Sequence, residues 1–245
     1  MSDRITTAKI PVEVHPKMWG SETWRTLPGH PLLFKTIDAR ERLSVQVHPN
    51  ERTRLVTGGD PKTEMWCLLD DGFVYAGLKA GVGARDVERA VADGSFEELM
   101  YRYDLKRGDA IFIPGGLVHA IGDNTRLYEV QQSSDTTFRL YDWGRRDANG
   151  QPRELHVEQA LKAIDYSLPK PEVVRDVSCE FFDFRRLAAK DFAPLARTAV
   201  VHAFRGGFRA GGIEFAEGED ALLAAGEGID GDGEVLVTQR PGECA

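Results

Sequence analysis

Gly108-Asp-Ala-Ile-Phe-Ile-Pro-Gly-Gly-Leu-Val-His119 is the stretch of this chain that decides its fold. Within it, Ala110–Ile113 has the apolar, β-branched character of a buried strand, and the Pro-Gly-Gly that follows predicts a tight turn. Gly115 and Gly116 can adopt the unusual backbone angles that such a turn requires. His119 comes soon after the turn, so the stretch predicts a strand end that presents an imidazole.

A second stretch, Leu43-Ser-Val-Gln-Val-His-Pro49, alternates apolar and polar residues. Successive side chains of a strand point to opposite faces of its sheet, so this alternation predicts one apolar and one polar face. The apolar face carries Leu43, Val45 and Val47, and the polar face carries Ser44, Gln46 and His48. Two strands that each project an imidazole from a polar face predict a metal site inside a β-barrel.

Short strand-like runs dominate the rest of the first 170 residues, and Gly, Asp and Pro separate them, which predicts a mainly β fold. The expected strands are Leu32–Ile37, Leu43–Val47, Glu64–Leu69, Phe73–Leu78, Tyr103–Leu105, Ala110–Ile113, Arg126–Gln132 and Phe138–Asp142. Helices are expected at Ala84–Ala92, Ser95–Tyr101 and Val157–Asp165, as insertions in the barrel or covers on it.

A domain boundary is expected at Ser167–Pro171, where Leu-Pro-Lys-Pro has the composition of a linker. The expected division is therefore residues 1–170, a metal-binding barrel with a helical insertion, and residues 171–245, a small β-domain. Strands are expected in the second domain at Glu180–Leu187, Ala199–Arg205, Phe208–Phe215, Ala221–Ala225 and Glu234–Gln239. His202 is its only histidine and has no neighbour at metal-ligand spacing, so no chemistry is expected there.

Composition narrows the class of protein. The 245 residues carry a formal net charge of −8, which argues against nucleic acid or an anionic membrane as a partner. No apolar run is long enough for a membrane span or a signal peptide. Cys67, Cys179 and Cys244 have no paired spacing, so we do not expect a disulfide framework. We expect a cytoplasmic location, where cysteines stay reduced. We expect a monomer or homodimer that acts on a small molecule.

The spacing of Gly108, Pro114, Gly116 and His119 resembles the second conserved motif of the cupin superfamily of β-barrels. A typical cupin has His-x-His at the first motif, whereas this chain has Gln46-Val-His48. The next well-placed carboxylate is Glu64, in Pro61-Lys-Thr-Glu-Met-Trp66. Two imidazoles, one carboxylate and one amide oxygen suit a divalent ion such as zinc, with a coordination position left for water or substrate.

Four linked motifs resemble the type I mannose-6-phosphate isomerases in their short bacterial form. They are the segments 35–49, 62–66, 108–120 and 128–142, and Arg153-Glu-Leu-His156 before a helix matches as well. The likeness covers roughly residues 17 to 165. It implies a double cupin with a small, degenerate second barrel, and the interconversion of mannose 6-phosphate and fructose 6-phosphate.

The resemblance also implies a role for individual residues. One Zn²⁺ per chain is expected at the family's four ligand positions, which fall on Gln46, His48, Glu64 and His119. The family's active-site lysine, arginine and further carboxylate fall on Lys62, Arg139 and Glu129. Two substrate-binding positions fall on Lys35 and Ser44, and the serine is linked in the family to the sugar phosphate.

These residue types suit an aldose–ketose isomerisation through an enediolate. The reaction needs a base, an electrophile for the developing oxyanion and a group that holds the phosphate. Zinc can polarise the substrate oxygens, and Arg139 adds fixed positive charge. The proton carrier stays open between Lys62, with a pKa lowered by nearby charge, Glu129 and a zinc-bound water.

Two other functions remain open. The short segment Met18-Trp-Gly-Ser-Glu-Thr-Trp24 stands where the family has a longer excursion, so a different phosphosugar is an alternative substrate. A protein of another class, a non-catalytic sugar-binding cupin that keeps its metal for structure, is the second alternative. Lys62 and Arg139 argue against it, because a structural metal needs neither residue.

Overall fold

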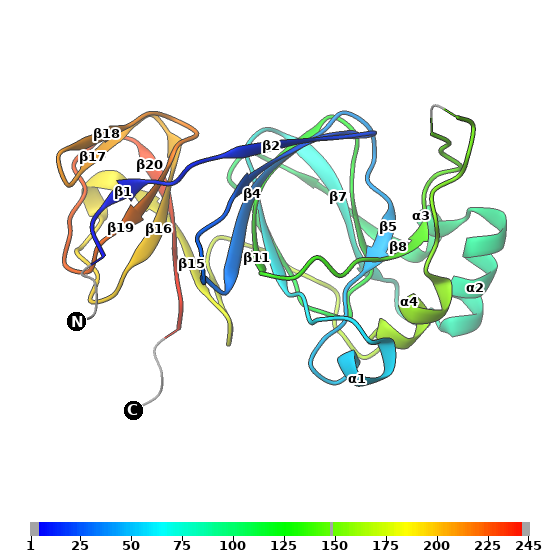
Figure 1. Ribbon diagram of the computed structural model, residues 1–245. Helices are drawn as coiled ribbons and strands as arrows, with labels where there is room; N and C mark the ends of the chain where they lie inside the picture. Colours follow the sequence, from blue (N-terminus) through cyan, green and yellow to red (C-terminus); the bar gives the residue numbers. More distant parts are fainter. Residues whose placement is uncertain (1–4, 148, 242–245) are drawn as a thin grey trace. The chain divides into compact units, whose positions relative to one another are not determined.

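The computed structural model describes residues 5–147 and 149–241. Its strands and helices form two compact units (Figure 1). The larger unit comprises residues 13–24 and 28–173, and the smaller unit comprises residues 1–12, 25–27 and 174–245. We keep the division into two domains near residue 170 as a prediction. No helix of the described residues is long and apolar enough to cross a membrane.

Two sheets build the larger unit, and the strand pairings recorded within them are antiparallel. The seven-stranded sheet has the order β13 (Val173–Val174), β9 (Ala110–Ile113), β6 (Glu64–Leu68), β11 (Thr125–Gln132), β4 (Leu32–Ala39), β3 (Gly20–Arg25) and β2 (Glu13–Lys17). The five-stranded sheet has the order β12 (Phe138–Tyr141), β5 (Val45–Val47), β10 (His119–Ile121), β7 (Gly72–Leu78) and β8 (Met100–Leu105). The mainly β prediction is confirmed.

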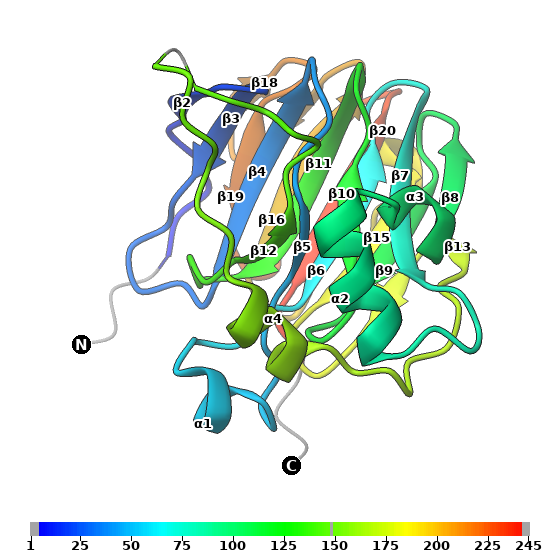
Figure 2. The ribbon, with the colours of Figure 1, turned by 90° about the vertical axis from the view of Figure 1, so that its right-hand side faces the viewer.

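Apolar side chains fill both sides of the five-stranded sheet. Between the two sheets lies a cluster that includes Trp66, Ile111 and Leu127, all fully buried. A second cluster, with Val45, Val47 and Phe96, lies under the helices. The helices are α1 (Arg54–Thr57), α2 (Ala84–Asp93), α3 (Phe96–Leu99) and α4 (Val157–Ala163). Figure 2 shows α2 and α4 in front of this sheet.

The helix and strand predictions hold in most places, with local corrections. The helix expected at Ser95–Tyr101 ends at Leu99, because β8 starts at Met100 and pairs with β7. Leu43 does not share a face with Val45 and Val47. It precedes β5 and joins the cluster between the sheets, while the two valines face the helices.

The smaller unit contains a six-stranded antiparallel sheet and a separate hairpin. The sheet order is β1 (Ala8–Lys9), β19 (Asp220–Leu223), β16 (Ala199–Arg205), β20 (Glu234–Gln239), β15 (Asp183–Ala188) and β14 (Val177–Ser178). The strand expected at Phe208–Phe215 is in fact the hairpin of β17 (Phe208–Ala210) and β18 (Ile213–Phe215). Gly211 and Gly212, both with positive φ, form its turn.

His202 is an internal structural residue of the smaller unit. Its ring is 2% exposed, and its Nδ1 lies 3.1 Å from Oδ2 of Asp220. The same carboxylate pairs with the buried guanidinium of Arg25. The histidine is therefore satisfied by a buried charge network.

The turn between β9 and β10 packs closely on its surroundings. Gly116 has φ +96°, and its N–H donates to the carbonyl of His48 at 2.7 Å. A Cβ on Gly115 would lie 2.6 Å from the carbonyl oxygen of Pro49, and one on Gly116 would lie 2.9 Å from Cβ of Asp165. Both glycines are therefore required by the approach of neighbouring chain, and the turn fixes where His119 begins β10.

We predict that Gly116→Ala destabilises the larger unit by roughly 2–4 kcal/mol. The alanine would have to adopt a positive φ, and its Cβ would also lie too close to neighbouring atoms. Gly29→Ala is the matched control, since Gly29 has φ +72° but no atom within 4 Å of an added Cβ. It is expected to cost only about 1–2 kcal/mol. Urea unfolding followed by tryptophan fluorescence measures both, because Trp19, Trp24, Trp66 and Trp143 all lie in the larger unit. Equal losses would refute the steric argument.

Candidate functional site

The register of the five-stranded sheet brings three predicted residues together. Gln46 on β5 lies opposite His119 on β10 and opposite Arg139 on β12. His48 follows β5 and is 1% exposed, and His119 is fully buried. The seven-stranded sheet supplies Glu64, the first residue of β6. The polar face predicted from the alternation of residues 43–49 therefore meets the carboxylate of the facing sheet.

Three of the four expected metal ligands form a close cluster. Ligand atoms of His48, Glu64 and His119 lie within 4.8 Å of one another, and all three side chains are buried. The fourth, Gln46, has its amide nitrogen 3.3 Å from Nε2 of His119. A 180° rotation of that amide presents its oxygen to the cluster instead.

Backbone carbonyls hold both imidazoles in the form that binds a metal. Nδ1 of His48 donates to the carbonyl of Thr136 at 2.8 Å, and Nδ1 of His119 donates to the carbonyl of Leu117 at 2.8 Å. A carbonyl only accepts, so each ring carries its proton on Nδ1 and turns the Nε2 lone pair toward the cluster. Burial, and then the charge of Lys62, lowers the pKa of His48 to about 3. Burial also lowers the pKa of His119.

The contact between His48 and Glu64 tests whether a cation fits. Nε2 of His48 lies 3.1 Å from Oε1 of Glu64, yet neither atom has a hydrogen to share when the ring is neutral. Burial opposes ionisation of Glu64, but His48 and Lys62 outweigh it and hold its pKa well below its usual range. A lone pair thus faces a carboxylate in a dry site. A divalent cation would satisfy both, so the donor set fits a metal such as zinc.

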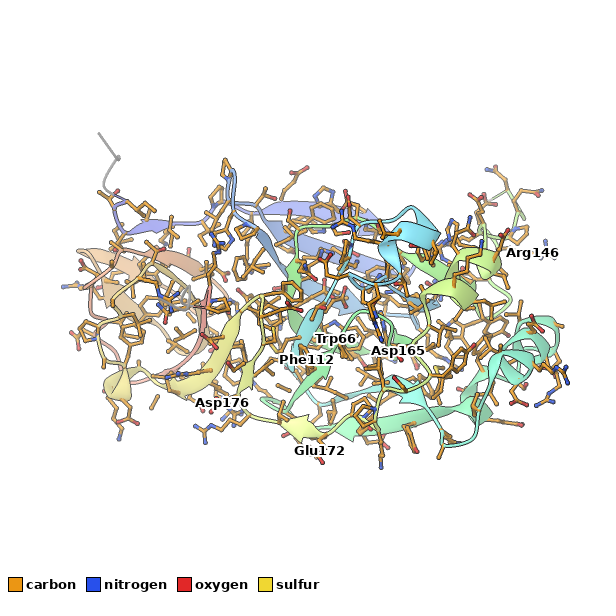
Figure 3. All side chains as sticks on the ribbon, turned by 90° about the horizontal axis from the view of Figure 1, so that it is seen from below. Trp66, Phe112, Arg146, Asp165, Glu172 and Asp176 are labelled. Carbon is orange, nitrogen blue, oxygen red and sulfur yellow. The ribbon has the colours of Figure 1, made fainter. Side chains whose placement is uncertain are left out.

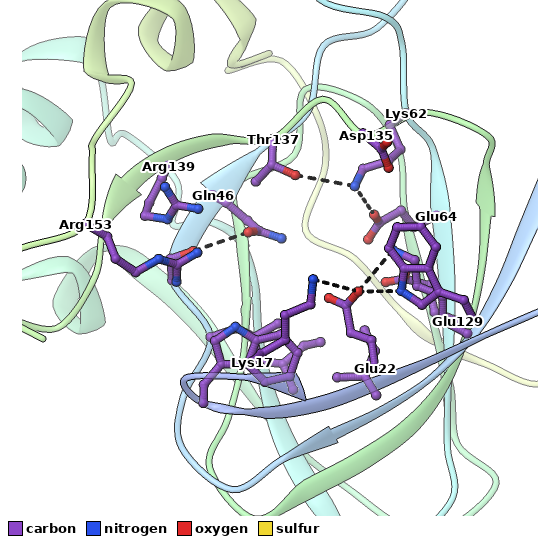
Figure 4. Close-up of a pocket in the computed structure, with 17 residues that line it drawn as sticks. Lys17, Glu22, Gln46, Lys62, Glu64, Glu129, Asp135, Thr137, Arg139 and Arg153 are labelled. Carbon is purple, nitrogen blue, oxygen red and sulfur yellow. Dashed lines mark hydrogen bonds and ion pairs between the residues drawn. The ribbon is translucent and has the colours of Figure 1, made fainter. Parts of the chain in front are cut away.

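A cavity of about 410 Å³ opens beside this cluster (Figure 4). The predicted residues that line it are Lys35, Ser44, Gln46, Lys62, Glu64, Glu129 and Arg139. His48 and His119 lie buried behind this lining. All nine residues named from the sequence are thus gathered at one site, although their roles there stay predictions.

Trp66 connects two carboxylates of the site. Its indole N–H lies 3.1 Å from Oε2 of Glu64 and 2.9 Å from Oε2 of Glu129, and its ring is fully buried. Figure 3 shows Trp66 among the packed side chains inside the larger unit. These two contacts could not be predicted from the sequence, because the partners of an indole are defined only once the strands pair. Glu129 lies opposite Trp66 in the pairing of β11 with β6.

Lys35 and Glu129 form a buried pair on neighbouring strands. Nζ of Lys35 lies 3.2 Å from Oε1 of Glu129 and donates to Oε1 of Gln131 at 2.6 Å. Burial lowers the pKa of Lys35, but the negative charges of Glu129 and its neighbours outweigh burial and raise it above its usual value. Burial, together with the nearby charge of Glu64, raises the pKa of Glu129 to about 7. Glu129 can therefore exchange a proton near neutral pH.

Several residues of the cavity were assigned no individual role from the sequence. The hairpin of β2 and β3 adds an edge with Lys17, Trp19, Glu22 and Trp24. The segment around β12 adds three more, Asp135, Thr137 and Arg153. Arg153 belongs to the Arg-Glu-Leu-His segment that matched the family in sequence. That match marked the segment, but nothing in the sequence indicated that Arg153 lines the cavity.

The raised pKa of Glu129 has a consequence for stability. A carboxyl whose folded pKa of about 7 exceeds its usual 4.5 favours folding while it is protonated, and this contribution is lost as pH rises through 7. In metal-free protein we therefore expect Glu129→Gln to gain about 2–3 kcal/mol of relative stability between pH 5 and pH 8.5. Urea unfolding of both proteins at the two pH values measures this difference. A difference that does not change with pH would contradict it.

Comparisons with known proteins agree with this fold. No family model matches the chain. The mannose-6-phosphate isomerase ManA of Bacillus subtilis is 39% identical over 156 residues, which cover 61% of this chain and 49% of that protein. The mannose-6-phosphate isomerase of Streptococcus mutans is 37% identical over 142 residues, 57% of this chain and 45% of that protein. The chain thus spans about half the length of these curated relatives.

Solved structures extend the likeness beyond the matched residues. The crystal structure of the mannose 6-phosphate isomerase from Bacillus subtilis has a TM-score of 0.83 at 21% identity, and covers 96% of this chain and 100% of that one. A mannose 6-phosphate isomerase bound with zinc and yttrium has a TM-score of 0.69 at 14% identity, with 96% of this chain and 100% of that chain covered. The chain therefore resembles proteins named mannose-6-phosphate isomerase in sequence over 61% of its length, and it shares the fold of the Bacillus subtilis structure over 96% of its length.

Proposed function

We propose that this protein is a zinc-dependent aldose–ketose isomerase that interconverts mannose 6-phosphate and fructose 6-phosphate. The observation that carries the proposal is one cavity that combines a cluster able to hold a metal with an ammonium, a guanidinium and a carboxyl of near-neutral pKa. The relatives named mannose-6-phosphate isomerase support the choice of substrate. The cysteines have no paired spacing in the sequence, which supports a cytoplasmic location.

The aldose–ketose isomerisation consists of proton transfers and a rearrangement of electrons within the sugar. A base removes the proton from C2 of the open-chain aldose, and the electrons of the C–H bond form the enediolate. A proton is then delivered to C1, and the hydroxyl proton passes from O2 to O1, so nothing is oxidised overall. Zinc held by Gln46, His48, Glu64 and His119 would supply a Lewis acid that polarises the carbonyl.

We assign the proton transfer to Glu129 rather than to Lys62. Nζ of Lys62 lies 3.3 Å from Oε1 of Glu64 and 3.5 Å from Oγ1 of Thr137, a position that suits an electrostatic stabiliser. Glu129 lines the cavity, and its ionised form is supported by the Lys35 ammonium and the Trp66 N–H. Arg139 adds positive charge from the facing sheet, toward the oxygen that becomes negative.

Zinc binding tests the metal part of the proposal without any assay of activity. Metal-stripped protein is expected to take up one Zn²⁺ per chain in competition with a coloured chelator. His48→Ala and His119→Ala should each weaken that affinity at least roughly hundredfold, because each removes one of the four proposed ligands. His30→Ala is the control, since His30 lies outside the cluster. If both ligand variants bound Zn²⁺ with the affinity of the wild type, the proposed metal site would be refuted.

Turnover tests the whole proposal. Zinc-loaded protein should convert mannose 6-phosphate into fructose 6-phosphate, and a chelator should stop it. Lys62→Ala and Arg139→Ala are expected to lower kcat roughly 10²–10³-fold while they keep the zinc, because each removes preorganised positive charge. Lys162→Ala, on the exposed face of α4, is the matched control for the lysine.

The outcome of that assay also separates the alternatives. A folded, zinc-loaded protein that turns over none of a panel of phosphosugars would sink the isomerase proposal. Turnover of a different phosphosugar, and not of mannose 6-phosphate, would change the substrate assigned to the enzyme. Sugar binding that survives both variants, without any turnover to lose, would identify a non-catalytic binding protein.

A further inference from the structure

The larger unit has a second cavity, of about 280 Å³, that the mechanism above does not use. No described residue lines both this cavity and the one beside the metal cluster. Its walls come from residues 78–82 at the end of β7, Tyr101 on β8, residues 116–118 before β10, and residues 164–166 and 168–170 after α4. A volume of 280 Å³ is that of roughly nine water molecules in the liquid, so the second cavity suits a small ligand.

Part of the wall of the second cavity is apolar. Leu117 and Val118, from the turn before β10, are buried residues that line it, and so is Ile164 after α4. Small-molecule sites combine such an apolar wall with a few polar groups that orient the ligand. The second cavity therefore suits a ligand with an apolar body rather than a bare inorganic ion.

Two lysines bring positive charge to the second cavity. Nζ of Lys79 donates to the main-chain carbonyl of Glu98 at 2.8 Å, and Nζ of Lys170 lies 4.9 Å from the centre of the Tyr101 ring. Across residues 5–147 and 149–241, neither ammonium has a carboxylate oxygen within ion-pair distance. A ligand with a negative charge would supply the counter-charge that both lack.

The carboxylate in the lining is already engaged by other groups. Oδ2 of Asp165, a residue labelled in Figure 3, pairs with the guanidinium of Arg52. Oδ1 of Asp165 accepts from the N–H of Ser167 at 3.0 Å and from its hydroxyl at 2.5 Å. Both oxygens thus have donors, and the arginine balances the charge, so Asp165 opposes an anion in the second cavity only weakly.

Two tyrosines add hydroxyl groups. Oη of Tyr101 accepts from the main-chain N–H of Ala80 at 3.4 Å, which leaves the hydroxyl hydrogen for a ligand. Burial, and then the charge of Glu88 on α2, raises the pKa of Tyr166, so this phenol stays protonated as a donor. Glu88 itself does not line the second cavity.

The turn before β10 forms one wall of the second cavity and also orients the metal cluster. The carbonyl of Leu117 accepts from Nδ1 of His119 at 2.8 Å. The N–H of Gly116 donates to the carbonyl of His48 at 2.7 Å, and the carbonyl of Gly116 accepts from the N–H of Asp165 at 2.9 Å. A ligand packed against this turn therefore binds the conformation that presents both imidazoles, which is also the conformation that a metal binds.

We propose that the second cavity binds a small organic anion with an apolar body, and that this anion and zinc raise each other's affinity. The charged group of the anion lies toward Lys79 and Lys170, and its body packs on Leu117 and Ile164. The coupling rests on the proposed zinc site. The anion site itself rests on neither the metal nor the isomerase function.

Benzoate tests the anion site, because it is small and its neutral amide, benzamide, has nearly the same shape. Calorimetry on the whole chain should give one benzoate site with a Kd on the order of 1 mM or tighter, and benzamide should bind roughly fivefold more weakly or not at all. Lys79→Gln and Lys170→Gln should each weaken benzoate about three- to tenfold and leave benzamide within about twofold.

Two further variants control for the location of the probe. Arg139→Ala removes positive charge from the cavity beside the metal cluster and should leave the Kd of benzoate unchanged. Lys106→Gln is the matched lysine control, because Lys106 is exposed, pairs with Asp71 and lines neither cavity. A melting curve for each variant separates lost binding from lost folding.

Zinc titrations in competition with a coloured chelator measure the coupling. Benzoate at saturation should tighten zinc binding about two- to tenfold relative to the same concentration of benzamide, and zinc should tighten benzoate by the same factor, because such coupling is reciprocal. In a protein with both Lys79→Gln and Lys170→Gln the factor should fall to about one.

The outcomes keep this site apart from the isomerase. Wild-type protein that binds benzoate no better than benzamide would overturn the anion site. Binding lost in Arg139→Ala but kept in both lysine variants would overturn it too, since benzoate would then lie beside the metal cluster. Binding that needs both lysines but does not change the zinc affinity would overturn the coupling. Binding that needs both lysines, in a protein without isomerase turnover, would uphold the anion site and remove the proposed function.

Discussion

The candidate site depends on the register of one short strand. β5 is three residues long, and its central residue, Gln46, has His119 on one side and Arg139 on the other. Val45 and Val47 are fully buried in the cluster under the helices, which pins the polar face of β5 toward the facing sheet. A slip of one residue would exchange these faces and bury Gln46 among apolar side chains. Hydrophobic packing on the outside of the barrel thus fixes the polar geometry within.

The inside of the barrel is unusual because it buries several charged groups. Lys35, Lys62, Glu64 and Glu129 are each at most 6% exposed. Burial of single charges is costly, but here each cation lies within 3.3 Å of a carboxylate, and Trp66 adds one N–H to two of them. Well-packed apolar residues would serve stability as well or better. These buried charged side chains are therefore better explained by a role in catalysis than by a contribution to folding stability.

Strand alternation and turn chemistry made much of this site predictable. Ser44, Gln46 and His48 share a face because side chains of a strand alternate, and Gly115 and Gly116 marked the turn that precedes His119. Resemblance to a family then supplied Lys62, Glu129 and Arg139, since no local pattern relates residues on three separate stretches of the chain. The structure gathers all of them.

The remaining features depend on tertiary contacts that leave little local trace. The hairpin of β2 and β3 was missed, because β2 is mostly exposed, β3 is mostly half-buried, and neither shows a clear apolar alternation. Leu43 changes faces because the strand begins two residues later than its pattern suggests. Arg153 lies on irregular chain, where periodicity says nothing about direction. The two hydrogen bonds of Trp66 follow from its pairing opposite Glu129.

The lining of the cavity contrasts with the chain as a whole. It contains five basic side chains (Lys17, Lys35, Lys62, Arg139 and Arg153) and four acidic ones (Glu22, Glu64, Glu129 and Asp135), whereas the whole chain has a net charge of −8. At distances beyond about 10 Å an approaching anion meets the field of the whole protein, weakened by salt, and that field repels it. Attraction begins only inside the cavity. A polyanion too large to enter the cavity therefore meets only the repulsive field of the whole protein. A small anion can enter and be attracted by the basic side chains, so the cavity selects for size and charge together.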